Sequence, residues 1–154
     1  MASNRHLGRI VALQTLYEYE FRVQAGDNSV DITEILDRNF ERYESAIDDR
    51  TFVDALVRGV LDATTDLDAK LQPIAPEWPI DQIARIDRAT LRIGLYELLH
   101  SADTVPPKVV INEAVELAKS FGSDNSSKFV NGVLGTAYRT LVEGGSEHGD
   151  TQAG

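Results

Sequence analysis

The fold is decided by the stretch from residue 107 to residue 141, which reads PKVVINEAVELAKSFGSDNSSKFVNGVLGTAYRTL. Pro107 suits the first turn of a helix, where its missing N–H costs nothing, and apolar residues then recur at helical spacing up to Phe121. Gly122 is expected to end this helix in a left-handed conformation, and Ser123 or Asp124 to cap the next one. The second helix has its own apolar stripe, formed by Val130, Val133, Leu134, Ala137 and Leu141. The stretch therefore predicts two helices joined by a polar turn.

The same helical period extends through the rest of the chain. It predicts helices over residues 4–24, 31–43, 49–71 and 87–100, with a short turn at residues 80–84. Asp31 is expected to cap the second of these helices, and Asp87 to cap the fourth. Three prolines break the chain between residues 73 and 79, and Trp78 among them is expected to pack inward. We therefore predict an all-α protein, a compact bundle of about six to seven helices.

The expected domain covers residues 1–143, and the glycine-rich, polar residues 144–154 are expected to form a disordered tail. At 154 residues the chain is long enough to bury a core of ordinary size. It has no cysteine and only three histidines, far apart in sequence, so neither a thiolate metal site nor a zinc site is expected. We expect no metal, no cofactor, no membrane anchor and a cytoplasmic location, because the N-terminus lacks the apolar segment of a secretory signal.

No pattern typical of catalysis occurs in the chain. It lacks a glycine-rich phosphate loop, a nucleophile elbow and an HExxH motif, and no histidine lies near the serines at 123, 126 and 127. Paired acids such as Asp48–Asp49 are more often a solvated helix face than a cation site. We therefore expect a protein that is not an enzyme.

The net charge of −10 is unevenly distributed. Residues 27–68 contain 12 acidic and 4 basic residues, whereas residues 1–17 contain two arginines and no acid, and residues 105–142 carry a net charge of +1. A polyanion would therefore approach the N-terminus and the 107–141 hairpin.

Two small groups of residues could meet nucleic acid. Arg5 and Arg9 lie near the start of the first predicted helix, with Tyr17 further along it, and Lys128 precedes Phe129 in the hairpin. One interpretation is that arginines and the lysine contact phosphates while the aromatic rings stack on bases. The other is an ordinary solvated N-terminus, with Tyr17 in the core and Phe129 folded back as a hydrophobic staple. The residues alone leave both interpretations open.

Several segments resemble a known family. KVVINEAVELAKSFG followed by SSKFVNGVLG closely resembles the C-terminal helical hairpin of the bacterial transcription antitermination factors of the NusB family. RIDRATLRIGLYELL at residues 85–99 resembles the preceding helix of that family, and ALQTLYEYE at residues 12–20 is a weaker match. The resemblance spans roughly residues 5–141, and KFVNG is its most specific part.

The resemblance implies an RNA-binding factor with no chemistry of its own. NusB proteins bind boxA RNA together with NusE, a ribosomal protein, and act in the transcription elongation complex with other Nus factors; no binding to DNA is expected. Carried onto this chain, the family's RNA-binding residues are Arg5, Arg9, Tyr17, Lys128 and Phe129, with Asn125 where some relatives have an acid. Asp87 matches an acidic residue of the NusE-facing surface. Many relatives carry more N-terminal arginines, so an alternative is an adaptor that holds NusE and binds little RNA itself.

Overall fold

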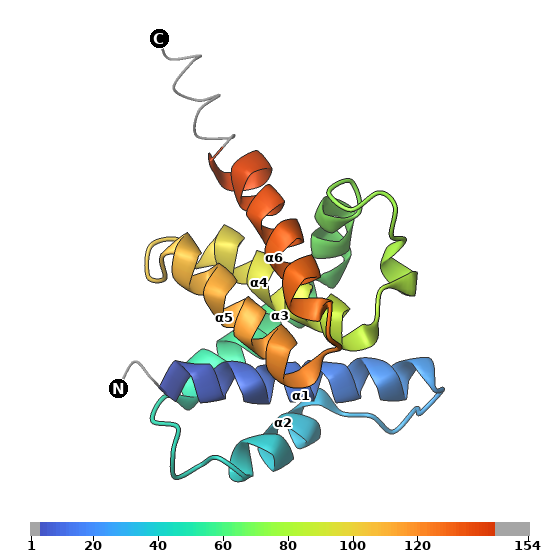
Figure 1. Cartoon of the computed structure of the whole chain (residues 1–154). Coiled ribbons are helices and arrows are strands. Elements are labelled where there is room, and N and C mark those ends of the chain that lie inside the picture. Colours follow the sequence, from blue (N-terminus) through green and yellow to red (C-terminus); the bar gives the residue numbers. More distant parts are fainter. Residues whose placement is uncertain (1–3, 144–154) are drawn as a thin grey trace. The chain divides into compact units, whose positions relative to one another are not determined.

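The structure, a computed structural model, describes residues 4–143 and is helical wherever it is regular (Figure 1). Its six α-helices are α1 (Asn4–Gln24), α2 (Ile32–Glu41), α3 (Arg50–Leu71), α4 (Arg85–His100), α5 (Pro107–Phe121) and α6 (Ser126–Ala137). A short 3-10 turn, η1 (Ile80–Gln82), precedes α4, and a π-helical turn, η2 (Tyr138–Glu143), follows α6. Within residues 4–143 there is no strand, which confirms the all-α prediction. The expected tail at 144–154 lies outside the described residues.

The chain forms two compact units, whose boundary follows Asp62 inside α3. The first unit contains α1, α2 and the start of α3, and the second contains the end of α3 and all that follows. The expectation of one domain over residues 1–143 stays a prediction.

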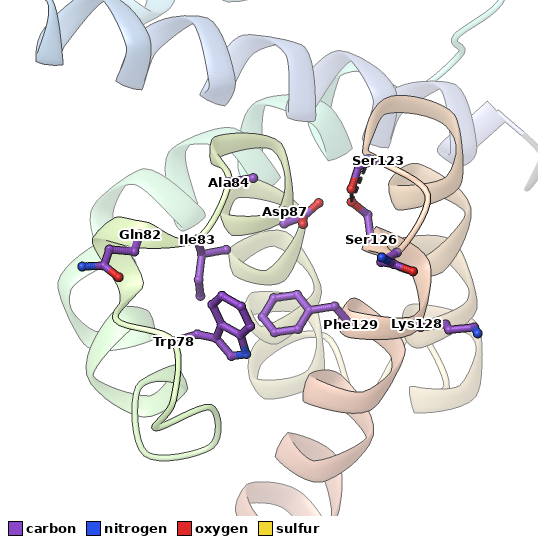
Figure 2. Close-up of a pocket in the computed structure, with 10 residues that line it drawn as sticks. Trp78, Gln82, Ile83, Ala84, Asp87, Ser123, Ser126, Lys128 and Phe129 are labelled. Carbon is purple, nitrogen blue, oxygen red and sulfur yellow. Dashed lines mark hydrogen bonds between the residues drawn. The ribbon is translucent and has the colours of Figure 1, made fainter.

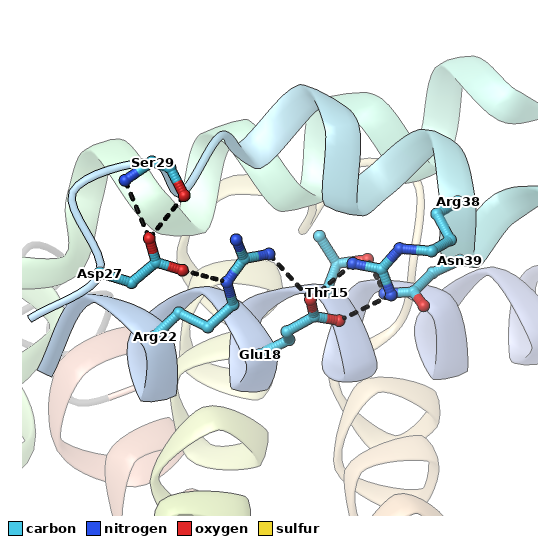
Figure 3. Close-up of polar contacts among 7 residues, drawn as sticks. All are labelled: Thr15, Glu18, Arg22, Asp27, Ser29, Arg38 and Asn39. Carbon is cyan, nitrogen blue, oxygen red and sulfur yellow. Dashed lines mark hydrogen bonds and ion pairs between the residues drawn. The ribbon is translucent and has the colours of Figure 1, made fainter. Parts of the chain in front are cut away.

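In the first unit, charged side chains join α1 to α2 and to the loop between them (Figure 3). Glu18 accepts hydrogen bonds from Arg38 at 2.5 Å and from Arg22 at 3.2 Å. The bond from Arg38 is the main reason that the pKa of Glu18 lies below its ordinary value. Asp27 accepts from the Ser29 hydroxyl at 2.6 Å and from Arg22 Nε at 2.8 Å, and these bonds lower its pKa to about 2.

The α2 helix begins as its sequence predicts. The Asp31 side chain accepts a hydrogen bond of 3.0 Å from the backbone N–H of Thr33, which satisfies one of the free donors of the first turn. Deeper in the unit, Asn39 donates to the Thr15 hydroxyl at 3.2 Å, and both residues are buried. The fully buried apolar residues of this unit include Val11, Leu13, Ile35, Leu36, Val53 and Val57.

In the second unit, α4, α5 and α6 lie side by side (Figure 1). They approach closely at Gly94 of α4, where a Cβ atom would lie 2.5 Å from Leu134 of α6 and 3.4 Å from Ala114 of α5. Glycine therefore sets the spacing of these helices. The surrounding core contains Leu91, Leu95, Val110, Leu117, Val130 and Leu134.

A bidentate ion pair fixes the end of α3 to α4. Arg92 donates from Nε and from its second guanidinium nitrogen to the two carboxylate oxygens of Asp68, both at 2.8 Å. The two side chains are largely shielded, with exposed fractions of 12% and 25%. This planar pairing gives the contact more geometric specificity than a surface lysine pair has.

None of the described helices is both long and apolar enough to cross a membrane.

Candidate functional site

The turn between α5 and α6 is built around Gly122, although not in the way that we predicted. Its backbone is extended, with φ −95° and ψ −166°, so the prediction of a left-handed helix end is wrong. Glycine is needed here because a Cβ atom would lie 2.6 Å from the Ser126 Cβ and 2.8 Å from the Ala118 carbonyl oxygen. The close approach of the turn to itself therefore determines this residue.

Ser126 holds the turn in place. Its hydroxyl is buried and accepts a hydrogen bond of 2.9 Å from the backbone N–H of Ser123, and the two hydroxyls lie 3.2 Å apart. Asn125, and neither Ser123 nor Asp124, stands at the N-cap of α6, and no side chain caps that helix. The predicted caps are therefore wrong: Ser123 contacts Ser126, the first residue of the helix, and does not cap it.

A single amide organises the proline-rich segment before α4. Gln72 donates to the carbonyl oxygens of Ala75 at 3.3 Å and Trp78 at 3.1 Å, and its own oxygen accepts from the N–H of Ile80 at 3.0 Å. The segment leaves Trp78 with 54% of its surface exposed, so the predicted inward packing is wrong. The tryptophan is held at the surface by bonds to its backbone.

The α4 helix begins two residues before the predicted cap. Arg85 is its first residue, which makes Asp87 the third helical residue and its capping assignment wrong. Arg88, the next residue, donates to the carbonyl oxygens of Ile80 at 3.1 Å and Ile83 at 3.0 Å and so ties the preceding turn to the helix. Asp87 is 9% exposed, and its buried Oδ1 accepts no hydrogen bond from the described part of the chain.

These three segments line a cavity of about 580 Å³ that is open to solvent (Figure 2). Its apolar walls are Trp78, Ile83, Ala84 and Phe129. Its polar lining consists of Gln82, Asp87, Ser123, Asn125, Ser126 and Lys128. We call it the aromatic cavity, because the rings of Trp78 and Phe129 meet edge to face, with centroids 6.3 Å apart and planes at 73°.

The structure thus brings four of the predicted site residues to one place. Asp87, Asn125, Lys128 and Phe129 all line the aromatic cavity. Phe129 is partly buried, between the two interpretations left open by the sequence, while Asn125 and Lys128 are exposed. In Figure 2 the Phe129 ring points toward Trp78, and the Lys128 side chain points away from the two rings.

The other three predicted residues lie on α1 in the first unit. Arg5 packs its guanidinium 4.5 Å from the centre of the Phe52 ring and lies 4.0 Å from Asp49, with 40% of its side chain exposed. Arg9 stacks over the same ring at 5.2 Å but is only 3% exposed. Tyr17 is partly buried and stacks on Phe21, with ring centroids 6.4 Å apart.

The chemistry available at the aromatic cavity is that of binding. Flat apolar rings, a carboxylate and an exposed ammonium group can hold a ligand by stacking, hydrogen bonding and charge. Over residues 4–143 no cluster of three or more histidine or acidic side chains is placed to hold a metal ion. The sequence did not identify Trp78 as a wall of the cavity or Gln72 as the residue that holds its segment. Both roles become visible only when the position of the proline-rich segment is known.

Comparison with known proteins identifies the family. The family model described as NusB matches residues 6–139. The transcription antitermination protein NusB of Chloroflexus aggregans is 46% identical over 145 residues, 93% of each chain, and that of Roseiflexus castenholzii is 44% identical over 148 residues, 94% of this chain and all of the relative. The solved structure of T. maritima NusB has a TM-score of 0.73 at 30% identity and covers 84% of this chain and 87% of its own. A structure of the antitermination factors NusB and NusE in complex with dsRNA has a TM-score of 0.75 at 22% identity over 91% of this chain and 99% of that one, which shows the shared fold. This chain belongs to the NusB family.

Proposed function

We propose that this chain binds boxA-type RNA together with NusE, and that it joins the transcribing RNA polymerase with other Nus factors in the cytoplasm. It acts by recruitment, with no chemistry of its own. One observation carries the RNA half of this proposal. Lys128 is exposed and forms no ion pair within residues 4–143, and it stands beside an aromatic ring that lines a cavity. A free cation next to a stacking surface is the arrangement used to bind single-stranded nucleic acid.

The comparison with a related structure supports NusE as the protein partner. The related structure described above contains NusB and NusE together with RNA, and this chain shares its fold. A ribosomal protein is a basic partner, and an acidic chain with a net charge of −10 complements it electrostatically.

The NusE-facing residue expected from the family is Asp87. Asp87 is 9% exposed and is one of the residues that line the aromatic cavity, so a NusE group would meet it at that cavity. NusE binding therefore depends on Asp87 only if a NusE side chain inserts there.

One observation favours the adaptor alternative. Arg9 is 3% exposed and packed over Phe52, which leaves Arg5 as the more accessible of the two N-terminal arginines. Because each phosphate contact contributes to affinity through counterion release, a single accessible arginine lowers the RNA affinity expected for the isolated protein. A basic partner can supply the missing contacts.

A titration of labelled boxA RNA with this protein, with and without NusE, tests the proposal. We expect binding that NusE strengthens and that weakens as salt is raised. Lys128→Ala should reduce the magnitude of the slope of log K against log salt by about 0.7, the value for one phosphate contact of a single strand. Lys119→Ala is the matched control, because Lys119 is an exposed lysine of α5 that pairs with Glu116 and lies outside the cavity lining.

Two results would contradict the proposal in different ways. If NusE binds this chain, but NusE alone holds boxA RNA as tightly as NusE together with this chain, the result supports the adaptor alternative. If Lys128→Ala and Lys119→Ala change the salt slope equally, the cavity region has no special part in RNA binding.

A further inference from the structure

In the first unit, the ring of Phe52 lies against two arginines of α1. The guanidinium carbon of Arg5 is 4.5 Å from the centre of this ring, and that of Arg9 is 5.2 Å from it. Both distances fall within the range of a cation–π contact. The two arginines are four residues apart in a helix, so their like charges are neighbours and repel one another. The negative face of an aromatic ring offsets this repulsion.

Gly8 explains how the ring comes so close to α1. A Cβ atom on this residue would lie 3.1 Å from Val53 Cγ2 and 3.3 Å from Phe52 Cδ2, both tighter than an ordinary contact. The backbone of α1 therefore packs directly against the first turn of α3. Because this packing places the ring, the position of Phe52 does not depend on the arginines that contact it.

The two arginines differ in what can reach them. Arg9 is 3% exposed, whereas 40% of the Arg5 side chain is exposed. An anion from solution can therefore meet Arg5 without displacing other side chains. A guanidinium that lies over a ring can still present its N–H edge to a phosphate, since the ring contacts only its face.

An internal anion already stands beside Arg5. Asp49 Oδ2 is 4.0 Å from the Arg5 guanidinium, with 52% of the Asp49 side chain exposed. This separation exceeds a hydrogen-bond length, and exposed ion pairs contribute little. The other oxygen, Oδ1, accepts a bond of 3.1 Å from the backbone N–H of Phe52, which caps the first turn of α3. The carboxylate is thus held near Arg5 without a hydrogen bond to it, and a phosphate that approaches more closely can replace it.

The rival interpretation is that Phe52 only joins α1 to α3. Two features favour a role in binding. The arginine nearer to the ring is the exposed one, and its ion pair is too long to hold its side chain. An arginine loses much rotamer freedom when it binds a phosphate, and a side chain that is already restrained loses less. The ring therefore lowers the entropic cost of a phosphate contact at Arg5.

We infer that Phe52 is a positioning residue for RNA binding: its ring holds the Arg5 guanidinium at the surface, where a phosphate of the RNA replaces Asp49. This rests on the proposed RNA-binding function. It adds to that function two residues, Phe52 and Asp49, that act through Arg5.

A double-mutant cycle tests the role of Phe52. We would titrate labelled boxA RNA with the full chain in the presence of NusE, for the unmodified chain, Arg5→Ala, Phe52→Leu and the double variant. Arg5→Ala should weaken binding about fivefold at 0.1 M salt, because one phosphate contact makes affinity vary as salt to the power of about −0.7. Phe52→Leu should weaken binding about 2- to 5-fold, the worth of an exposed cation–π contact. In the Arg5→Ala background it should change affinity by less than about 1.5-fold, since the partner of the ring is then absent.

Two further variants separate positioning from packing. Phe52→Tyr keeps the aromatic face and should bind RNA as the unmodified chain does. Phe40→Leu is the matched control for Phe52→Leu, because the Phe40 ring also carries an arginine, Arg50, at 4.8 Å. It removes the same kind of contact elsewhere in the same unit and should leave RNA affinity unchanged. Melting curves establish that each variant is folded.

Asp49→Asn tests the exchange without altering the apolar packing. Asparagine caps a helix about as well as aspartate but carries no charge. The variant should raise RNA affinity about 1.5- to 5-fold more than its matched control, the range for loss of a competing exposed ion pair. That control is Glu44→Gln, which removes one negative charge from an exposed residue of the same unit outside the Arg5 pair. The extra gain should vanish in the Arg5→Ala background.

Three outcomes would overturn the inference. If Phe52→Leu weakens RNA binding equally with and without Arg5, the ring acts by packing alone. If Asp49→Asn gains no more than Glu44→Gln, or gains as much without Arg5, no phosphate replaces Asp49. If Arg5→Ala binds boxA RNA with unchanged affinity and salt slope, Arg5 is no phosphate contact, although the proposed function still stands. A failure of the unmodified chain to bind RNA, with or without NusE, rejects the proposed function as well.

Discussion

Replacing Phe129 by alanine separates packing from ligand binding at the aromatic cavity. The ring is partly buried and makes an edge-to-face contact with Trp78. Full burial of a phenylalanine stabilises by about 3 kcal/mol at most, so half of that is about 1–1.5 kcal/mol. The aromatic pair adds about 0.5–1.5 kcal/mol. We therefore expect Phe129→Ala to lower the free energy of unfolding by about 1.5–3 kcal/mol, below the ~3–5 kcal/mol of an emptied core site.

The same variant should also lose RNA affinity. The expected loss is about 1–3 kcal/mol, the worth of one base–aromatic stack, and it should exceed any effect on NusE binding. Urea unfolding followed by circular dichroism measures the stability, and a boxA titration measures the affinity.

Phe129→Leu is the matched control for this experiment. Leucine keeps most of the apolar contact but has no flat face, so stability should fall by less than about 1.5 kcal/mol while the loss of RNA affinity persists. The reasoning is refuted if Phe129→Leu binds RNA as tightly as the unmodified chain, or if Phe129→Ala loses 4 kcal/mol or more of stability and both partners together.

Three other predictions concern residues that hold the cavity segments in place and an ion pair of the first unit. Gly122→Ala should destabilise by about 1–3 kcal/mol in urea unfolding, because its Cβ would overlap the turn, whereas Gly132→Ala, with open space around it, should be neutral or stabilising. Gln72→Leu should free the segment that carries Trp78 and so lower its fluorescence anisotropy, with helix content by circular dichroism unchanged. The stabilisation from Asp27 is complete above its ordinary pKa of 3.8 and is lost as the pH falls toward about 2, because the folded state holds the carboxylate and the unfolded state takes up the proton first. Asp27→Asn should therefore flatten the decline of unfolding free energy across that window, and an unchanged slope would contradict the assignment.

Helix positions could be read from the sequence because each helix has a strong apolar period. The first predicted helix, residues 4–24, has the observed bounds of α1, and the end of α3 at Leu71 is also as predicted. The Asp31 cap was predictable for the same reason, since it depends only on the residues that follow it. Local pattern and local chemistry agree at these positions.

Features that depend on distant contacts were not predictable. Asp87 has the chemistry of a cap, but the bonds from Arg88 to residues 80 and 83 accompany a helix that begins earlier, at Arg85. Trp78 has the hydrophobicity of a core residue, yet the Gln72 amide holds its segment so that the ring lines the cavity and stays 54% exposed. No spacing in the sequence indicates that one amide will bind three backbone groups.

The candidate site was predictable in part. Lys128, Phe129, Asn125 and Asp87 were identified from the family resemblance, and their convergence on one cavity needed the structure. The sequence predicts that Arg9 and Arg5 share an accessible strip. Arg9 lies one turn further along α1, packs over Phe52 and has only 3% of its surface exposed. Their roles in RNA and partner binding stay predictions. The expectation of a protein that is not an enzyme is confirmed by its place among the antitermination factors.

The Ser123–Ser126 pair described above has a consequence for the speed and cost of binding. Because this hydrogen bond and the tight turn at Gly122 shape the loop before any ligand arrives, the protein loses little conformational freedom on binding. The conformational entropy that is lost on binding is then mainly that of the single-stranded RNA. Association at this turn should accordingly proceed without a slow rearrangement of the protein, and its heat-capacity change should reflect the contact area and not the folding of a loop.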